Sequence, residues 1–250
     1  MQRASLAPGT DSGETQKLEI PMQFHNRTIV ITGGTGALGT AVVSALLAGG
    51  AHCRIPTRSD QEADAFPHKD RVTLVTRCDL TDEADVARLY EGVTDLWASI
   101  HIAGGFAMGN VADTNKAALM QMLNTNFISC YLCCRAALAA FGPAGGRIVN
   151  VASRPALEPR VGAGSTAYTA SKAAVTALTQ ALAVELAGRN ILVNAIAPAI
   201  IDTPANRAAM PNANHAAWPT PDEISAIIAF LASPENKVTS GAVVPVYGRA

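Results

Sequence analysis

The feature that most constrains the fold is a glycine-rich segment directly after a short apolar run. Residues 28–39 read TIVITGGTGALG, so β-branched residues lead into Gly33, Gly36 and Gly39, and an Ala-rich stretch follows. Glycines at this spacing let the backbone turn tightly and approach a pyrophosphate, while the next helix offers free N–H groups and a positive dipole end. A glycine cluster is also typical of a flexible surface turn, but its place between a strand and a helix favours a dinucleotide site.

Beyond this segment, short apolar runs alternate with longer stretches of helical period. The expected strands are 28–32, 51–57, 71–77, 96–102, 146–151, 190–196 and 242–246, and the expected helices are 37–48, 82–92, 116–140, 167–187 and 221–231. Continuously apolar strands separated by helices predict a parallel sheet covered on both faces. We therefore predict an α/β fold: one Rossmann-type, doubly wound domain over residues 24–250, with a seven-stranded, mostly parallel sheet. The polar residues 1–23 are expected to form a flexible N-terminal tail.

The composition limits the classes of partner. Charged residues make up 16% of the chain, below the roughly 25% of typical domains, and the formal net charge is −1. A field of that size does not attract a polyanion, and the apolar runs fall short of the roughly 18 residues of a membrane helix. We therefore expect a globular protein whose partner is a small molecule, with no role for nucleic acid or membrane.

The cysteines and histidines show no pattern of a disulfide framework or a metal site. There are five of each, and no secretory signal pattern precedes them, so we expect free thiols in a reducing, cytoplasmic compartment. Cys130 and Cys133 have the spacing of a redox or metal pair, but they lie inside the apolar run 127–138 without a second pair. We interpret them as small core residues and expect no metal dependence.

The end of the second expected strand bears on the choice of nicotinamide cofactor. NAD-specific sites place a carboxylate there to accept from the ribose 2′-OH, whereas this chain has Thr57 followed by Arg58 and Ser59. A guanidinium and a hydroxyl suit a 2′-phosphate, so NADP(H) is favoured and NAD(H) stays possible. Arg58 is alternatively a solvated loop residue, and the nearby Asp60 weakens the case for NADP(H).

Tyr168 and Lys172 are the candidate catalytic pair. They lie four residues apart, on one face of an expected helix, after a strand that ends at Ser153. A cation beside a phenol stabilises the phenolate and lowers its pKa toward the working range of an acid–base catalyst. A surface Tyr and Lys would be the alternative, but ligands of open α/β sheets bind at the carboxyl ends of strands, where Ser153 lies.

Together these motifs resemble the short-chain dehydrogenase/reductase family, over residues 26–250. The motifs that carry the resemblance are TGGTGALG at 32–39, CDLT at 78–81, AGG at 103–105, Asn126, Ser153, Tyr168 with Lys172, and NAIAP at 194–198 followed by Thr203. The resemblance implies that Tyr168 is the general acid–base and that Ser153 polarises the substrate carbonyl. Lys172 would bind the nicotinamide ribose, and Asn126 would hold a water that links Lys172 to solvent.

The resemblance also implies a cofactor site and an activity. The activity would be hydride transfer between NAD(P)(H) and a carbonyl, alcohol or C=N group, of the carbonyl reductase type. Asp79 and Leu80 would flank the adenine, Ala103 and Gly104 the adenosine ribose, and Ile201 and Thr203 the carboxamide and pyrophosphate. The full expected cofactor set is Gly33, Thr35, Gly36, Leu38, Gly39, Arg58, Ser59, Asp79, Leu80, Ala103, Gly104, Gly105, Tyr168, Lys172, Pro198, Ile201 and Thr203.

Some positions depart from the family pattern. His101-Ile102 stands where Asn-Asn is usual, which puts in doubt a hydrogen bond that braces the sheet. The segment from Ser153 to Tyr168 is also longer than is usual in the family, and it must fold back to bring Ser153 to the site. Residues 33–39, 103–110 and 202–211 with Trp218 also resemble quinonoid dihydropteridine reductase. Those enzymes lack the serine and prefer a carboxylate at the second strand, so pterin reduction is the runner-up.

The expected substrate walls are apolar. Phe106, Met108, Met210 and Trp218 would line them, with residues 204–219 as the substrate-binding segment, although each side chain is equally typical of ordinary packing. The helices expected at 116–140 and 167–187 are apolar around much of their circumference, which favours a homo-oligomer, a tetramer or dimer. Two further alternatives are a redox-neutral enzyme and a non-catalytic NADP-binding protein.

Overall fold

The framework of the protein is a parallel sheet. The computed structural model describes residues 23–249, in which seven strands pair in the order β3-β2-β1-β4-β5-β6-β7, and each neighbouring pair is parallel. The strands are β1 (Thr28–Thr32), β2 (His52–Pro56), β3 (Thr73–Val75), β4 (Leu96–His101), β5 (Gly146–Val151), β6 (Ile191–Pro198) and β7 (Val243–Val246). The order reverses between β1 and β4, which is where a doubly wound sheet opens a crevice for ligands.

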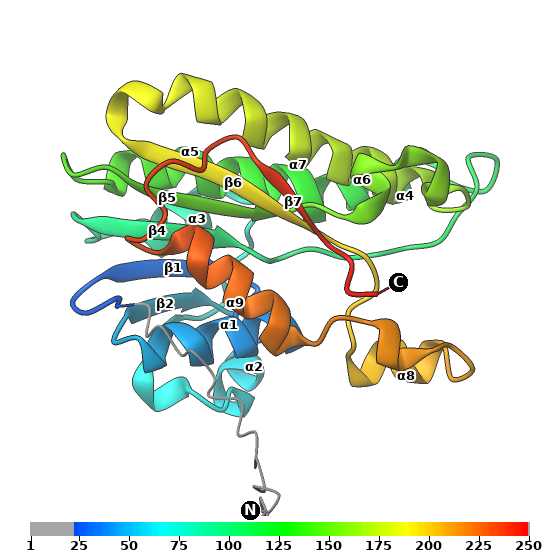
Figure 1. Ribbon diagram of the computed structural model, residues 1–250, viewed down its shortest axis with the longest axis horizontal. Helices are drawn as coiled ribbons and strands as arrows, with labels where there is room; N and C mark the ends of the chain where they lie inside the picture. Colours follow the sequence, from blue (N-terminus) through cyan, green and yellow to red (C-terminus); the bar gives the residue numbers. More distant parts are fainter. Residues whose placement is uncertain (1–22, 250) are drawn as a thin grey trace, which may run out of the picture.

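Helices cover both faces of this sheet, as Figure 1 shows. The helices α1 and α9 lie on one face, and α4, α5 and α7 lie on the other. The α-helices are α1 (Ala37–Ala48), α2 (Asp60–Ala65), α3 (Glu83–Tyr90), α4 (Lys116–Leu123), α5 (Ser129–Ala140), α6 (Arg154–Leu157), α7 (Thr166–Glu185), α8 (Pro204–Ala209) and α9 (Pro221–Ala232). Shorter turns are η1 (Lys69–Arg71), the π-helical η2 (Asn124–Ile128), η3 (Pro159–Gly162), η4 (Ala187–Arg189) and η5 (His215–Ala217).

The alternation of side chains along β1 explains why the strand is apolar throughout. Ile29 and Ile31 pack into the core under α1 and α9, while Val30 packs into the core under α3, α5 and α7. All three are fully buried, because both faces of the strand are covered. Burying each such side chain contributes about 1.5–3 kcal/mol, so the strand is held by its two cores.

The sequence-based boundaries hold best for the central strands, and the differences have local causes. The third strand is shorter than expected, and the helix expected over 116–140 contains the π-helical turn at Asn124–Ile128. The helices α2, α6 and α8 were not predicted. Of these, α2 begins after Ser59, whose side chain accepts from the Glu62 N–H as an N-cap.

Trp97 fixes the amino-terminal side of the sheet to α9. Its indole Nε1 donates to Ala232 O at 2.9 Å, and the Arg27 guanidinium lies 3.5 Å from its ring centroid. Arg147, on the neighbouring strand, lies 5.1 Å from the same ring, and burial lowers the pKa of its guanidinium. The indole is therefore held by a hydrogen bond and by two cations over its ring.

Two expectations concern regions beyond the folded core. The flexible tail predicted at residues 1–23 falls almost entirely on residues 1–22, which lie outside the described residues. Within 23–249, none of the helices combines the length and apolar character that crossing a membrane would require.

Candidate active site

A large cavity lies at the carboxyl ends of the strands, where the sheet order reverses. Its volume is ≈ 800 Å³, and its walls come from the glycine-rich turn, the end of β2, the segment after β3 and the end of β4. Eleven of the expected cofactor residues line it: Gly33, Thr35, Gly36, Leu38, Gly39, Arg58, Asp79, Leu80, Ala103, Gly104 and Ile201. The size and place of the cavity fit an extended dinucleotide.

The glycine-rich turn has a backbone that only glycine allows. Gly33 has φ +68°, and a Cβ there would lie 2.7 Å from Ala103 N; a Cβ on Gly39 would overlap the Gly33 carbonyl. The helix α1 starts directly after Gly36, and within the described residues no side chain caps it. Its first N–H groups therefore stay available to a phosphate, and no acidic side chain in the first turn opposes an anion.

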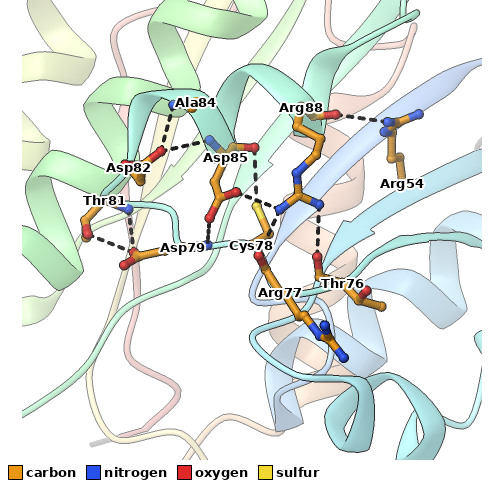
Figure 2. A network of polar contacts seen from close by, with 10 residues as sticks. All are labelled: Arg54, Thr76, Arg77, Cys78, Asp79, Thr81, Asp82, Ala84, Asp85 and Arg88. Atoms are coloured by element: carbon orange, nitrogen blue, oxygen red, sulfur yellow. Dashed lines mark hydrogen bonds and ion pairs between the residues drawn. The ribbon is translucent and has the colours of Figure 1, made fainter.

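The wall after β3 is held by a network of charged and polar groups, shown in Figure 2. Asp79 N donates to Asp85 Oδ2 at 2.9 Å, and Asp79 Oδ1 accepts from Thr81 N and Thr81 Oγ1. Arg88 donates to Thr76 O, Arg77 O and Asp85 Oδ1, so α3 is tied to this loop. The segment expected to flank the adenine is thus held in place by hydrogen bonds within itself and to α3.

An acidic side chain that the sequence did not suggest lies near the end of β2. Glu62, on α2, lines the cavity, accepts from Arg58 N at 2.8 Å and from Thr35 Oγ1 at 2.5 Å, and lies 3.6 Å from Arg58 Nε. Burial raises the pKa of Glu62, but the hydrogen bonds from Thr35 and Arg58 N and the charge of Arg58 outweigh it and hold this pKa below its usual value. A carboxylate therefore bridges the glycine-rich turn and the second strand.

The groups expected to hold a 2′-phosphate are either exposed or already hydrogen-bonded within the chain. The Arg58 side chain is 89% exposed, and the Ser59 hydroxyl is used as the N-cap of α2. Thr57 Oγ1 donates to Ser59 O at 3.1 Å. The sequence signal that could have found Glu62 is the pattern Ser59-x-x-Glu62, which is typical of a helix start.

The four expected catalytic residues lie around the end of β5 and Gly104. Lys172 Nζ donates to Val151 O at 2.8 Å, two residues before Ser153. A Cβ built on Gly104 would lie 2.7 Å from Asn126 Oδ1 and 3.1 Å from Lys172 Nζ, so both groups meet at this glycine. Asn126 also exchanges hydrogen bonds with Gly105 N and O, at 2.9 and 3.0 Å, and donates to Ser171 Oγ at 3.0 Å.

Ser153 lies close enough to Tyr168 to act on its ionisation, despite the longer segment between them. That segment folds into α6 and η3, which pack against α7 and take up the extra length. Burial raises the pKa of Tyr168, and the Ser153 hydroxyl opposes this rise. Ser153 Oγ is buried and has no hydrogen bond of ordinary geometry among residues 23–249, so it is free to serve a ligand.

The expectation of a lowered Tyr168 pKa is wrong for this structure. The Lys172 ammonium donates to Val151 O, and it does not lower the pKa of Tyr168 in this structure. Burial lowers the pKa of Lys172 itself to about 8, and the nearby Cys130 opposes that shift. Tyr168 is therefore protonated at neutral pH, as a proton donor must be.

The expected substrate walls divide into exposed and buried residues. Phe106 is 62% exposed and packs edge-on against Tyr168, with ring centroids 4.9 Å apart, and Met108 lies against Gly164. Trp218, by contrast, is buried and packs on His215 at 4.7 Å. Phe106 is thus the aromatic side chain that the structure brings to the phenol.

Some expected cofactor residues lie outside the cavity lining, and others were missed. Those outside are Ser59, Gly105, Tyr168, Lys172, Pro198 and Thr203. Thr203 Oγ1 instead caps α8 by accepting from Asn206 N. The lining residues that sequence reasoning missed are Ala37, Pro56, Glu62, Arg77, Cys78, Thr81, Ile102, Thr125, Ser129 and Val151.

Known proteins resemble this chain in sequence and in fold. Residues 27–214 match the family described as short chain dehydrogenase. A cis-4-hydroxycyclohexanecarboxylate dehydrogenase of Sinomonas cyclohexanicum is 33% identical over 243 residues, which cover 90% of this chain and 96% of that protein. A galactitol 2-dehydrogenase of Rhizobium johnstonii is 32% identical over 236 residues, with 87% and 92% covered. A solved structure described as ElxO with NADP bound has a TM-score of 0.82 at 26% identity, covering 89% of this chain and 97% of that one.

Proposed function

Because the chain belongs to the short-chain dehydrogenase family, we propose that it transfers a hydride between NADP(H) and a carbonyl or alcohol group of a small molecule, with Tyr168 as general acid–base. The observation that carries the proposal is a protonated, half-buried Tyr168 phenol close to the buried Ser153 hydroxyl, which follows two residues after Val151 in the wall of a dinucleotide-sized cavity. A C=N substrate would be reduced by the same groups. The named relatives, which include dehydrogenases of a cyclic and an open-chain alcohol, support this substrate class.

The chain's own groups divide the work at the reacting carbonyl. Nicotinamide supplies the hydride chemistry when the cofactor is bound. Tyr168 donates its proton to the substrate oxygen, and Ser153 donates a hydrogen bond to the same oxygen and polarises the carbonyl. Lys172 and Asn126, which meet at Gly104, are suited to bind the nicotinamide ribose and to return a proton from solvent. Phe106 packs on the phenol ring and limits its rotation.

The preference for NADP(H) rests on Arg58 and the bound cofactor of the ElxO structure. The Arg58 guanidinium is exposed and would have to turn from Glu62 toward a 2′-phosphate, and Arg77, which is paired with Asp60, also lines the cavity. Glu62 opposes this preference, since its carboxylate would accept from a ribose 2′-OH. We propose that the chain favours NADP(H) and retains measurable use of NAD(H).

We also propose a cytoplasmic homo-oligomer, a tetramer or dimer, that uses α4, α5 and α7. Apolar side chains are exposed on these helices, among them Leu119, Tyr131 and Val184, and a second copy would cover them. Light scattering after gel filtration tests the proposal, because a monomer would exclude it.

A substrate panel with paired variants tests the function. Ketones, aldehydes and quinonoid dihydropterin are offered with NADPH and with NADH, to the wild type, to Tyr168→Phe and to Tyr131→Phe. Tyr131 is an exposed tyrosine on α5 and serves as the control. We expect NADPH oxidation with carbonyl compounds, and a loss of at least about 10²-fold in kcat for Tyr168→Phe alone.

The other outcomes separate the alternatives. Preferential turnover of the dihydropterin would make the chain a pterin reductase. Conversion without a change in nicotinamide absorbance would make it a redox-neutral enzyme. NADPH binding with no conversion of any substrate would make it a non-catalytic binding protein.

A further inference from the structure

A second cluster of reactive side chains lies in the core between β4, β5 and α5. His101 Nδ1, Cys130 Sγ and Cys134 Sγ all lie within 4.8 Å of one another. Asn150 Oδ1 completes the group, at 2.8 Å from His101 Nδ1, 3.3 Å from Cys130 Sγ and 3.7 Å from Cys134 Sγ. All four residues are buried, with at most 5% of their surface exposed. The proposed hydride transfer uses none of them.

The sequence conceals this cluster because its members come from three separate elements. His101 ends β4, Asn150 lies beside it in the register of β5, and the two cysteines are one helical turn apart on α5. His101 occupies the position where the family usually has asparagine, and it still bridges β4 and β5 through Asn150. The brace between these strands, which the sequence put in doubt, is therefore present with a different side chain.

The distances in the cluster match a tetrahedral metal site. With metal–sulfur bonds of about 2.3 Å and metal–nitrogen bonds of about 2.0 Å, the edge between S and N of a zinc tetrahedron is about 3.5 Å. The two edges from His101 Nδ1 to Cys134 Sγ and Cys130 Sγ are 3.5 and 3.9 Å. The edges from Asn150 Oδ1 to the sulfurs lie in the same range. Of these five edges, the one from His101 Nδ1 to Asn150 Oδ1 is short at 2.8 Å, so the amide would retreat by roughly half an ångström on binding.

Outer hydrogen bonds already aim the donors at a common centre. His101 Nε2 lies 2.8 Å from Ser99 Oγ, which in turn lies 2.7 Å from Tyr90 OH. Asn150 Nδ2 donates to Thr179 Oγ1 at 2.9 Å, which directs its Oδ1 toward the sulfurs. Partners of this kind fix the orientation of metal ligands in known sites.

We propose that His101, Cys130 and Cys134, with Asn150 as a fourth and weaker donor, bind one Zn²⁺ or similar thiophilic cation. The two thiols each release a proton to solvent as the ion binds, so the charge of the buried site stays neutral. When the ion binds, the proton that His101 Nδ1 donates to Asn150 Oδ1 in the metal-free chain moves to Nε2, toward Ser99 Oγ. The ion would tie α5 to β4 and β5, and its role is structural and separate from the chemistry at Tyr168.

The burial of the cluster determines how the site must be loaded. Because every donor is covered, the ion enters while the chain folds or when α5 opens locally. The full chain is therefore expressed in medium with added Zn²⁺, purified under reducing conditions, and analysed for metal by mass spectrometry. A parallel preparation with Co²⁺ gives a direct test of ligand type, since thiolate ligation produces charge-transfer absorption that oxygen ligation does not.

The expected result is one equivalent of Zn²⁺ per chain and thiolate-to-cobalt absorption in the wild type. At a hundredfold excess over the dissociation constant, the ion should raise Tm by about 5 °C. His101→Asn, which restores the residue usual in the family, and Cys134→Ala should lose both the metal and the shift. Cys133→Ala, a buried cysteine on the same helix but outside the cluster, should keep them.

Two results would overturn the proposal. One is wild-type protein with less than a tenth of an equivalent of metal and no thiolate absorption with Co²⁺, a measurement that needs no variant to fold. The other is metal that remains equally bound in His101→Asn and Cys134→Ala, which would place it elsewhere on the chain.

Discussion

Replacing Gly104 by alanine tests the geometry on which the catalytic assignment depends. The added Cβ would lie 2.7 Å from Asn126 Oδ1 and 3.1 Å from Lys172 Nζ, so one or both groups must move by several tenths of an ångström. Asn126 cannot move freely, because it exchanges two hydrogen bonds with Gly105 and donates to Ser171. Overpacking of this kind costs about 1–3 kcal/mol of stability, which is roughly 2–6 °C in Tm for a chain of this size.

The effect on turnover should exceed the effect on stability. Displacement of a positioning group by up to an ångström costs as much as about 10²-fold in rate, so we expect kcat to fall about 10- to 100-fold. Steady-state oxidation of NADPH with the best carbonyl substrate measures this fall, and thermal unfolding measures Tm. Gly188→Ala is the matched control, because nothing lies within 4 Å of a Cβ there and both values should stay unchanged. If Gly104→Ala behaved like this control, Asn126 and Lys172 would not meet at Gly104 as described.

The remaining predictions concern the cofactor, the substrate and the pH dependence of stability. Arg58→Asp should shift the preference toward NADH. Glu62→Gln should strengthen NADPH binding about 5- to 10-fold, since a like charge near the phosphate costs about 1 kcal/mol. The dissociation constants of both cofactors measure these effects, and no change in either variant would place the 2′-phosphate elsewhere. Ser153→Ala should lower kcat about tenfold or more, whereas near-normal turnover would point to the serine-less pterin reductases. Burial lowers the pKa of Lys172 from 10.5 to about 8, so the folded chain releases this proton at a lower pH than the unfolded chain does. The free energy of unfolding should therefore rise between pH 8 and 10.5. Lys172→Met should lack this rise, which is worth about 3 kcal/mol. Denaturant titrations at several pH values measure it, and an equal increase of the unfolding free energy with pH in the two proteins would contradict the lowered pKa of Lys172.

The sheet and the glycine-rich turn were predictable because local sequence determines them. Five β-branched or apolar residues before a glycine-rich turn define β1, and the Cβ contacts of Gly33 and Gly39 confirm why glycine is needed there. The π-helical turn at Asn124–Ile128 was not predictable, since helical periodicity predicts a continuous helix over 116–140. Asn126 within it is held by Gly105, far away in the sequence.

Contacts between distant segments also account for the site residues that were missed. Glu62 joins the cavity only because Thr35 and Arg58 N both donate to its carboxylate. The group formed by His101 and the two cysteines of α5 depends on the register between β4 and β5 and on the packing of α5 against them. The pattern Ser59-x-x-Glu62 predicts a helix start but not the contact of Glu62 with Thr35, and no spacing along the chain joins His101 to the cysteines of α5.

Because Trp97 and Trp218 lie in different parts of the fold, the intrinsic tryptophan fluorescence of the protein reports on two separate regions. The chain has two tryptophans: Trp97 is locked at the start of β4 by Ala232 and two guanidinium groups, whereas Trp218 packs on His215 in the segment after α8. Emission from the first indole reads out global unfolding, and emission from the second reads out movement of the segment after α8. A Trp97→Phe chain would thus carry a single built-in probe of that segment, without any attached dye.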